Sequence, residues 1–540
     1  MAIIVFLCLL GSLPQTATKM FASFILHTVC RHLKRTGKIT EDEHINKVEH
    51  LPQPFQQTLQ QLQKVAFDGL VEDKIVFTMN DLPDMCRDDP TCYGLLQSVE
   101  CYCSDEIGTP TKSFNFLHLG IQEYFAAKYV ATLPENKVYT LLEESFLVTE
   151  YDPDSKSARL SNMWIMYCGI TSGQCISLRH YLSNFEQHNM IRNDYSLPQT
   201  GPSDNRSTSI SQDILKDPVK VLYLFQCFQE AQDDKFCGIL SKSFDSGRIN
   251  ISTHRFLPHQ VVSLGFFLSR SHRNWKELNL EECYIGDNGI NLLHHYLCGD
   301  KANKEEVIVI NLNQNYLSSA SSPLIGDIIT HLQPHTLKLD GNHNTSVRDI
   351  STAVTNTDQL RVLYIIRNNT TSTGAIAVAN SLLHNTSLEV LDTSFNPIGQ
   401  DGATAIAQAI TNNKTLKKLN INNCKITSTG ARAIANSLLH NASLEVLLMS
   451  NNAIGQDGAI AIALAITNNK TLKILYLYGD GTINEESAII IIKSIHYNNI
   501  ITKLWLFPSL RDNGNVKRAV ERINSTRRKC YIQELEVEYY

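Results

Sequence analysis

One stretch towards the C-terminal end of the chain nearly repeats itself. Residues 385–411 read NTSLEVLDTSFNPIGQDGATAIAQAIT, and residues 441–467 read NASLEVLLMSNNAIGQDGAIAIALAIT. Residues 413–440 carry a variant of the same frame between them. A fixed period of about 28 residues is typical of a solenoid, in which one unit cannot bury its own apolar face and stacked neighbours cover it. We therefore expect this part of the chain to be a repeat array.

Each unit combines a short strand with an amphipathic helix. Leu391 and Thr393 are expected in the core, because strand side chains alternate between two faces. The residues that alternate with them are expected to face out: Val390, Asp392 and Ser394. From Ala403 to Ile410, small and apolar residues recur at i, i+3, i+4 and i+7, which predicts a helix with one buried face.

The same frame extends in both directions along the chain. Its middle apolar position falls at Leu278, Ile310, Leu337, Leu363, Leu391, Leu419, Leu447, Leu475, Leu504 and, at the end, Leu535. The position five residues later reads Cys283, Asn315, Asn342, Asn368, Asn396, Cys424, Asn452 and Asp480. An asparagine there can bond backbone groups that are otherwise unpaired where the strand turns away. This L-x-x-L-x-L-x-x-N/C pattern resembles the leucine-rich repeat of ribonuclease-inhibitor-like proteins, which implies an α/β horseshoe.

A second pattern lies near the N-terminus. Residues 113–133 read SFNFLHLGIQEYFAAKYVATL and are predicted to be a strand that enters a helix. The pattern F-x-H-x-x-x-Q-E-[FY]-x-A-A resembles the winged-helix signature of NACHT-type nucleotide-switch proteins, the NOD-like receptors. Its residues here are Phe116, His118, Gln122, Glu123, Tyr124, Ala126 and Ala127. Residues 13–33 resemble the segment leading into that winged helix, and residues 164–173 and 221–233 resemble the helical domain before the repeats.

This resemblance predicts the domain organisation and an α/β fold class: a winged helix and an α-helical domain followed by a leucine-rich-repeat solenoid. Residues 1–12 would be the remnant of a nucleotide-binding domain, and residues 13–133 the winged-helix-like domain. Residues 134–255 would form the helical domain with a flexible loop at 196–213, and residues 256–540 the repeats with a C-terminal cap. Within the winged-helix-like part, residues 92–100 are predicted to be helical.

The resemblance also implies a nucleotide contact at His118. In the family, the histidine of this motif contacts the β-phosphate of ADP, and an imidazole N–H can donate to a phosphate. Alternatively, His118 satisfies a backbone group at the strand–helix junction, and Gln122 and Glu123 cap the helix or brace a domain contact. Since no G-x-x-x-x-G-K-[ST] loop occurs in the sequence, we expect no enzyme activity and no ADP or ATP cofactor unless the missing nucleotide domain is supplied.

The cysteines and the N-terminus indicate in which cellular compartment the protein is expected. The 14 cysteines are scattered, which favours reduced thiols in the cytoplasm over a disulfide framework. The group around Cys101 and Cys103, with Cys86 and Cys92, lacks a zinc-ligand spacing, so no metal is expected. Residues 2–10 are similar to a secretory signal, but no Lys or Arg precedes them. N-x-S/T sequons recur with the repeat at Asn385, Asn413, Asn441 and Asn469, so they follow from its consensus.

The inner face of the predicted horseshoe is the candidate binding surface. Its outward strand positions are polar in the N-terminal half and large and apolar at the C-terminal end. The candidate ligand-binding residues are Tyr364, Leu448, Tyr476, Tyr478, Trp505 and Phe507. Large apolar side chains pointing out of a sheet mark recognition patches, and Trp and Tyr are common in hot spots. The alternative is that a following segment or the C-terminal strand covers them as a cap.

We therefore expect a non-catalytic sensor or regulator of NOD-like-receptor type that binds a protein or pathogen-derived ligand in innate-immune-type signalling. The net charge of −6 gives no support for nucleic-acid binding, and no membrane partner is expected. A monomer is expected, because oligomerisation in the family runs largely through the nucleotide domain. The alternatives are a nucleotide-switch NTPase truncated in this sequence and a free-standing ribonuclease-inhibitor-like scaffold, cytosolic or secreted.

Overall fold

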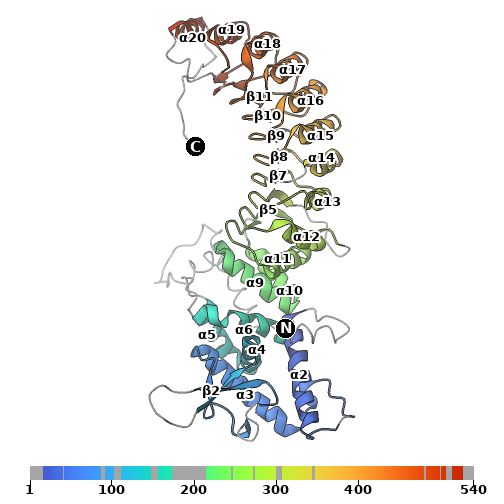
Figure 1. The fold of residues 1–540 in the computed structure, drawn as a ribbon, viewed down its shortest axis with the longest axis vertical. Helices are drawn as coiled ribbons and strands as arrows, with labels where there is room; N and C mark the ends of the chain where they lie inside the picture. Colours follow the sequence, from blue (N-terminus) through green and yellow to red (C-terminus); the bar gives the residue numbers. More distant parts are fainter. Residues whose placement is uncertain are drawn as a thin grey trace, which may run out of the picture. The chain divides into compact units, whose positions relative to one another are not determined.

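A computed structural model divides the chain into two compact units, Met1–Ser243 and Phe244–Tyr540 (Figure 1). The structure describes residues 16–40, 42–86, 92–101, 111–146, 156–172, 215–244, 247–271, 274–299, 307–342, 347–479, 482–498, 500–505 and 514–526. The predicted remnant 1–12, the predicted loop 196–213, Asp480, Phe507, Leu535 and the C-terminal strand of the predicted cap lie outside these residues.

The first unit combines helices with one small sheet. Its helices are α2 (Ala17–Arg35), the 3-10 turn η1 (Val48–His50), α3 (Gln53–Val71), η2 (Asp84–Cys86), α4 (Leu119–Val130), α5 (Glu135–Phe146), α6 (Lys156–Thr171), α9 (Pro218–Ala231) and α10 (Asp234–Ser243). Its strands are β1 (Phe77–Thr78), β2 (Leu96–Cys101) and β3 (Thr111–Phe116), which form an antiparallel sheet in the order β1-β3-β2. Helices around a small antiparallel sheet agree with the winged-helix prediction.

The prediction of a helix at residues 92–100 is wrong. Cys92 and Tyr93 have left-handed backbone angles, with φ of 41° and 61°, so a right-handed helix cannot run through them. The chain then enters β2, where Leu96 pairs with Phe116 of β3. The hydrogen bonds that β3 supplies come from a segment distant in sequence, so the local apolar pattern did not reveal them.

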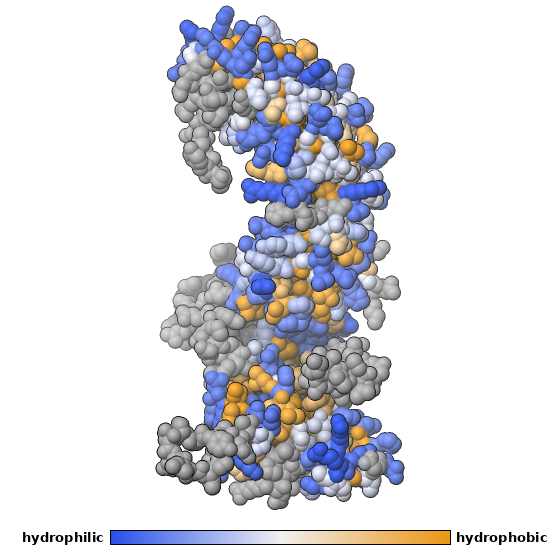
Figure 2. Space-filling model, viewed as in Figure 1, coloured by the Kyte–Doolittle hydropathy of each residue, from blue (hydrophilic) through white to orange (hydrophobic). Residues whose placement is uncertain are grey.

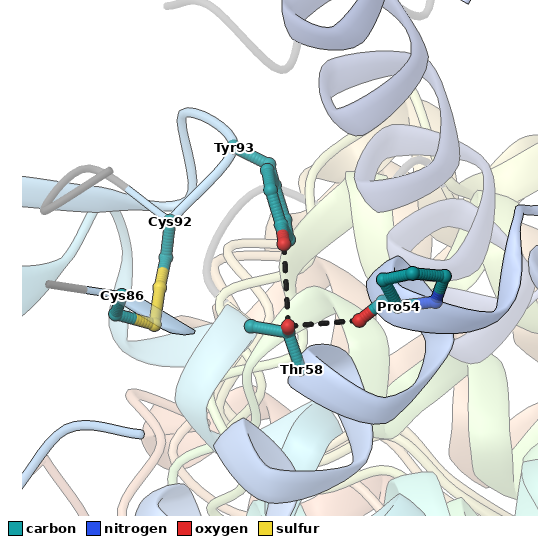
Figure 3. The surroundings of a disulfide bond; sticks show 5 residues. All are labelled: Pro54, Thr58, Cys86, Cys92 and Tyr93. Carbon is teal, nitrogen blue, oxygen red and sulfur yellow. Dashed lines mark hydrogen bonds between the residues drawn. A yellow bond between two sulfur atoms is a disulfide. The ribbon is translucent and has the colours of Figure 1, made fainter. Parts of the chain in front are cut away.

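A disulfide joins Cys86 and Cys92, whose Cα atoms lie 5.5 Å apart (Figure 3). The expectation of reduced thiols throughout is therefore wrong for this pair: the η2 turn and the turn at Cys92 bring the two residues within bridging distance. Next to the bridge, the Tyr93 hydroxyl is 3.2 Å from Thr58 Oγ1, and Thr58 donates to the carbonyl of Pro54. Cysteines of the described part of the chain that are not in a disulfide include Cys30, Cys168, Cys227, Cys237, Cys283, Cys298 and Cys424.

Glu230 of α9 ties the start of α2 to the helical part of the first unit. Its carboxylate accepts from the backbone N–H of Ala17 at 2.8 Å and from that of Thr18 at 3.1 Å. The Thr18 hydroxyl also donates to it, at 2.8 Å. A carboxylate is favourable at a helix N-terminus because it meets both the free N–H groups and the positive end of the helix dipole.

The second unit alternates strands and helices over its whole length. Its strands are β4 (Arg248–Asn250), β5 (Trp275–Asn279), β6 (Val307–Asn311), β7 (Thr336–Lys338), β8 (Val362–Tyr364), β9 (Val390–Asp392), β10 (Lys418–Asn420), β11 (Val446–Leu448), β12 (Ile474–Tyr476) and β13 (Lys503–Trp505). Its helices are α11 (Pro258–Arg270), α12 (Gly286–Leu297), α13 (Ser322–Leu332), α14 (Val347–Asn356), α15 (Ser372–Leu382), α16 (Gly399–Asn412), α17 (Ser428–Leu438), α18 (Gly455–Asn468), α19 (Glu485–His496) and α20 (Gly514–Thr526).

These strands form one 10-stranded parallel sheet in strict sequence order, β4 to β13. Within this unit the strands line the inner side of an arc and the helices its outer side (Figure 1). The predicted middle positions from Leu278 to Leu504 pair in register across neighbouring strands, and all are buried. The predicted solenoid is therefore confirmed. Its sheet begins with β4, where Ile249 pairs with Leu278, ahead of residue 256.

Asparagines that follow the strands connect consecutive repeats by hydrogen bonds, as predicted. Asn396 Oδ1 accepts from the backbone N–H groups of Asn368 and Thr370, at 2.9 and 3.0 Å. Its Nδ2 donates to the carbonyls of Ile365 and Thr393, at 2.7 and 2.9 Å. The same kind of bonding recurs at Asn315, Asn342 and Asn452. These side chains satisfy backbone groups that would otherwise be buried without partners.

Cys424 occupies the repeat position that asparagine holds in other repeats, and it bonds through a thiol instead of an amide. Its thiol donates to the carbonyl of Thr393 at 3.3 Å. Burial raises the pKa of this thiol to about 12, so it stays protonated and remains a donor. A thiol has no oxygen with which to accept a bond, so Cys424 supplies the donor of the asparagine amide but not its acceptor oxygen.

The sequon asparagines form a second ladder, between each helix and the next strand. Asn441 Nδ2 donates to the carbonyls of Ile410 and Asn413, at 2.7 and 3.3 Å, while its Oδ1 accepts from the N–H of Leu444 at 2.8 Å. Equivalent bonds are made by Asn385, Asn413, Asn469 and Asn498. The sequons therefore recur because asparagine at this position bonds the backbone of the preceding repeat. Asn498, which continues the ladder, is not part of a sequon.

Candidate functional site

Three of the predicted ligand-binding residues lie side by side on the inner face of the sheet. The register of β11, β12 and β13 places Leu448, Tyr476 and Trp505 in one row. The rings of Tyr476 and Trp505 stack, with centroids 4.5 Å apart and 12° between planes. Tyr478, two residues further along, lies 6.3 Å from the Trp505 ring. We call Leu448, Tyr476, Tyr478 and Trp505 the inner aromatic cluster; all four side chains are half-buried.

Tyr364 is not part of this cluster. It lies in β8, with β9 and β10 between it and Leu448. Its neighbours in register are Lys338 on one side and Asp392 on the other. Burial, together with the carboxylates of Asp392 and Asp340, raises the pKa of the Tyr364 hydroxyl. Tyr364 is therefore a neutral side chain in a polar part of the face, apart from the inner aromatic cluster, and its role in ligand binding stays a prediction.

Asp392 and Ser394 were expected to face out, but both are buried. Asp392 is only 6% exposed, because its carboxylate accepts from the N–H and hydroxyl of Ser394, at 3.0 and 2.7 Å, and from Asn420 Nδ2 at 2.7 Å. The two residues do point towards the inner side of the sheet, as alternation predicts. There, Asn420 of the neighbouring strand bonds the Asp392 carboxylate.

Asp340 is a second carboxylate that sequence reasoning did not single out. Its pKa is raised to about 6, chiefly by burial, with smaller contributions from the negative charges of Asp392 and Glu281. One oxygen accepts from the N–H of Ile366 at 2.8 Å, which partly offsets the effect. The signal that could have found it is the recurrence of Glu281, Asp340 and Asp392 at inner-face positions of different repeats.

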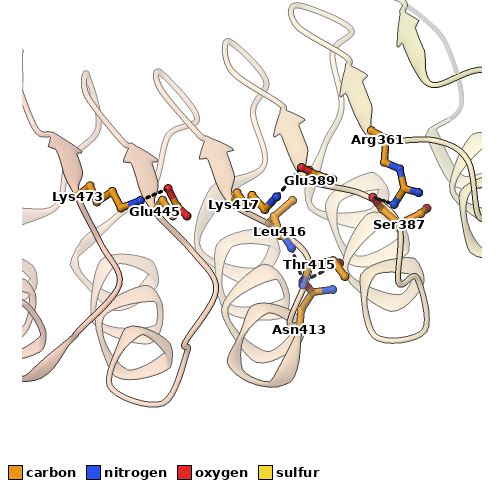
Figure 4. A network of polar contacts seen from close by, with 9 residues as sticks. All are labelled: Arg361, Ser387, Glu389, Asn413, Thr415, Leu416, Lys417, Glu445 and Lys473. Carbon is orange, nitrogen blue, oxygen red and sulfur yellow. Dashed lines mark hydrogen bonds and ion pairs between the residues drawn. The ribbon is translucent and has the colours of Figure 1, made fainter. Parts of the chain in front are cut away.

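Charged residues of alternating sign line the edge where the strands begin (Figure 4). Lys417 pairs with Glu389 at 2.8 Å, and Lys473 pairs with Glu445 at 2.6 Å. Each pair joins consecutive repeats, since the partners are 28 residues apart. These ions are well exposed, so solvent screens each pair and the pairs contribute little to the free energy of unfolding.

In the first unit, His118 lies at the junction that the sequence predicted. It is the N-cap of α4, where Nδ1 accepts from the N–H of Gly120 at 2.9 Å. This is the structural role given as the alternative to a phosphate contact, and the phosphate contact stays a prediction. The side chain is exposed.

Gln122 and Glu123 hold α4 against its neighbours, as their bracing role predicts. Gln122 Nε2 donates to the carbonyl of Lys74 at 3.1 Å. Glu123 Oε1 accepts from Asn162 Nδ2 of α6 at 3.0 Å. Burial raises the pKa of Glu123, and the bond from Asn162 acts against that effect. Both residues therefore serve packing within the first unit.

Within the described ranges, no group of three or more His, Cys, Asp or Glu side chains has a geometry that could hold a metal ion. No helix among the described residues combines the length and the apolar character needed to cross a bilayer.

Comparison with known proteins supports both halves of the resemblance. Residues 53–114 match the NLRC5 helix-turn-helix domain, and residues 384–407, 412–435 and 440–463 match a leucine-rich repeat. The chain is 24% identical over 297 residues to Protein NLRC5 of Ictalurus punctatus, which covers 52% of this chain and 15% of that protein. It is 26% identical over 137 residues to Protein NLRC3 of Mus musculus, covering 25% and 12%. The chain thus spans a small part of either relative.

Among solved structures, leiomodin-1 actin-binding site 2 is similar at 20% identity and a TM-score of 0.26, covering 28% of this chain and 86% of that one. The fold and the family matches define a leucine-rich-repeat protein with an NLRC5-type helix-turn-helix domain. In these two parts the chain is similar to proteins of the NOD-like-receptor type.

Proposed function

We propose that this chain acts as a non-catalytic recognition module in the cytoplasm, binding a protein or pathogen-derived ligand on the inner face of its repeats. The observation that carries the proposal is the inner aromatic cluster on β11, β12 and β13. Its four large side chains come from adjacent strands and are only half-buried. Such clusters of Trp and Tyr dominate the binding energy of many protein interfaces.

The geometry of the cluster follows from the sheet. Neighbouring strands lie about 4.8 Å apart, which is close to the spacing of stacked rings. The register of β12 and β13 therefore holds Tyr476 and Trp505 parallel before any ligand arrives. A rigid aromatic surface loses little conformational entropy on binding, which favours affinity. Burial and the neighbouring Tyr478 raise the pKa of the Tyr476 hydroxyl, so it stays neutral and able to donate.

A comparison within the chain shows that the cluster is not a requirement of the fold. Asp392 and Leu448 occupy the same position of nearly identical repeats, and Asn420 of β10 lies between them in register. The sheet thus accepts Asp, Asn or Leu at this place. The apolar residue at 448 extends the aromatic surface of β12 and β13, which supports a role in recognition.

The test compares proteins captured by the wild-type chain with those captured by Trp505→Ala and Leu448→Asp. Leu448→Asp introduces the residue that the twin repeat carries. We expect captured ligands to be lost from both variants and retained by Lys338→Ala, an inner-face control at the same strand position of β7. Melting temperatures should stay close to the wild-type value. Unchanged capture by both variants would contradict the proposal, and a large loss of stability would mean that these side chains are core.

A further inference from the structure

The two nearly identical repeats differ on their outer helices as well as on their strands. α16 reads GQDGATAIAQAITN and α18 reads GQDGAIAIALAITN, so Thr404 and Gln408 are replaced by Ile460 and Leu464. Both apolar replacements are exposed, Ile460 by 42% and Leu464 by 59%. Because α16 forms the same helix with polar residues at these positions, the fold does not require Ile or Leu there.

Neighbouring helices extend this apolar surface and border it with charge. The buried alanines Ala431, Ala459 and Ala488 occupy equivalent positions of α17, α18 and α19. The residue after each of them therefore falls in one row: Arg432, Ile460 and Ile489. The next row, one turn later, reads Asn436, Leu464 and Lys493. We call Ile460, Leu464 and Ile489 the outer-helix patch.

The patch has an exposed cation on each side. Arg432 lies beside Ile460 on α17, and Lys493 lies beside Leu464 on α19; both are exposed. Figure 2 shows hydrophobic side chains at the surface among hydrophilic ones over the helices of the repeats. At the N-terminal ends of the two helices, Asp457 and Glu486 are exposed acids.

We propose that the outer-helix patch docks an amphipathic helix of a partner protein, with leucine-type residues on its apolar face and Asp or Glu along its flanks. Ile460 and Leu464, one turn apart, form a ridge of the kind that packs into the groove of another helix. Arg432 and Lys493 would meet the acidic flanks of that helix. An anionic membrane is the less favourable occupant, because a flat surface laid on the patch would also cover the acids Asp457 and Glu486, whereas a single helix contacts a narrower strip. This surface is separate from the inner aromatic cluster.

The experiment uses the full chain and a fluorescently labelled synthetic helix with leucines on one face and glutamates on its flanks. The main variant, Ile460→Thr/Leu464→Gln, restores the residues of the twin helix α16, so it is expected to fold normally. We expect its affinity for the peptide to fall about tenfold or more. Arg432→Glu/Lys493→Glu should also weaken binding. The control Thr404→Ile/Gln408→Leu makes the opposite change on α16 and should not lower affinity.

Several outcomes would overturn the proposal. One is that the wild-type chain does not bind the peptide; another is that it binds the peptide no better than the Ile460→Thr/Leu464→Gln variant does. Binding to phosphatidylserine vesicles that the same variant abolishes, with no peptide binding, would assign the patch to a membrane surface. A wild-type dimer in sedimentation that the variant converts to monomer would assign the patch to a second copy of this chain.

Discussion

Asn441 Nδ2 donates to the main-chain oxygen of Ile410 at 2.7 Å, across 31 positions of the sequence. Nδ2 is also the atom to which N-linked glycan is attached. Asn441 is only 5% exposed, and its amide is surrounded by backbone of the preceding repeat. The apparent glycosylation site is therefore a structural element of the solenoid.

The first prediction concerns these sequons. In folded protein expressed through a secretory pathway, Asn385, Asn441 and Asn469 should carry no glycan, because the acceptor nitrogen is buried and already hydrogen-bonded. Mass spectrometry of tryptic peptides measures this directly. A substantially glycosylated Asn441 in folded protein would contradict the ladder.

The same ladder predicts a cost in stability. Asn441→Ala should lower the free energy of unfolding by about 1–3 kcal/mol, because two backbone carbonyls and two N–H groups lose their partner. The control is Asn412→Ala, at an exposed helix end, which should change it by less than about 0.5 kcal/mol. Urea denaturation followed by circular dichroism gives both values, and equal values for the two variants would contradict the assignment.

Leu447 and Leu448 are adjacent, but we expect their substitution by alanine to lower stability by very different amounts. Leu447 is fully buried between sheet and helices, so Leu447→Ala should cost about 2–5 kcal/mol of unfolding free energy. Leu448 points to the inner face and is half-buried, so Leu448→Ala should cost less than about 1.5 kcal/mol. Thermal melts of the two variants test the alternation directly. A large loss at 448 would show that a following segment covers the cluster.

The raised pKa of Asp340 predicts that the stability of the fold depends on pH. Its folded-state pKa is about 6, against 3.8 for the ordinary value, so the folded protein binds the proton more tightly than the unfolded chain. Ionisation of Asp340 therefore destabilises the fold above pH 6, and this loss is relieved as the pH falls from about 6 towards 4. Asp340→Asn should be more stable than wild type at pH 7, and the difference should vanish near pH 4. Urea denaturation across this range measures it, with the exposed Asp457→Asn as control.

Substitutions of His118 distinguish a helix-capping role from a nucleotide-binding role. His118→Ala removes the bond to the Gly120 N–H and should cost about 0.5–2 kcal/mol, whereas Asn, a good N-cap, should restore most of it. Titration calorimetry with ADP and ATP should show no binding by the wild-type chain, since its sequence has no P-loop. Micromolar binding that is lost in His118→Ala would instead establish a nucleotide site at this junction.

Sequence reasoning succeeded where a signal is local and repeated. The period predicted the parallel sheet, the buried leucines and the asparagine ladder after each strand, because every repeat places these residues in the same surroundings. It failed at residues 92–100, where pairing of Leu96 with Phe116 decides the structure. It also failed at Cys86 and Cys92, which the surrounding turns bring together.

The sequence by itself determined that the second unit is a leucine-rich-repeat solenoid and that Leu448, Tyr476 and Trp505 share its inner face, since register follows from the repeat. Only the tertiary structure decided that Asp392 is buried and that the sequon amides are occupied. The physical reason is the same in each case. Burial and hydrogen bonding depend on side chains and backbone of the neighbouring repeat. The distance between groups of two repeats is set by how the repeats stack, not by local sequence.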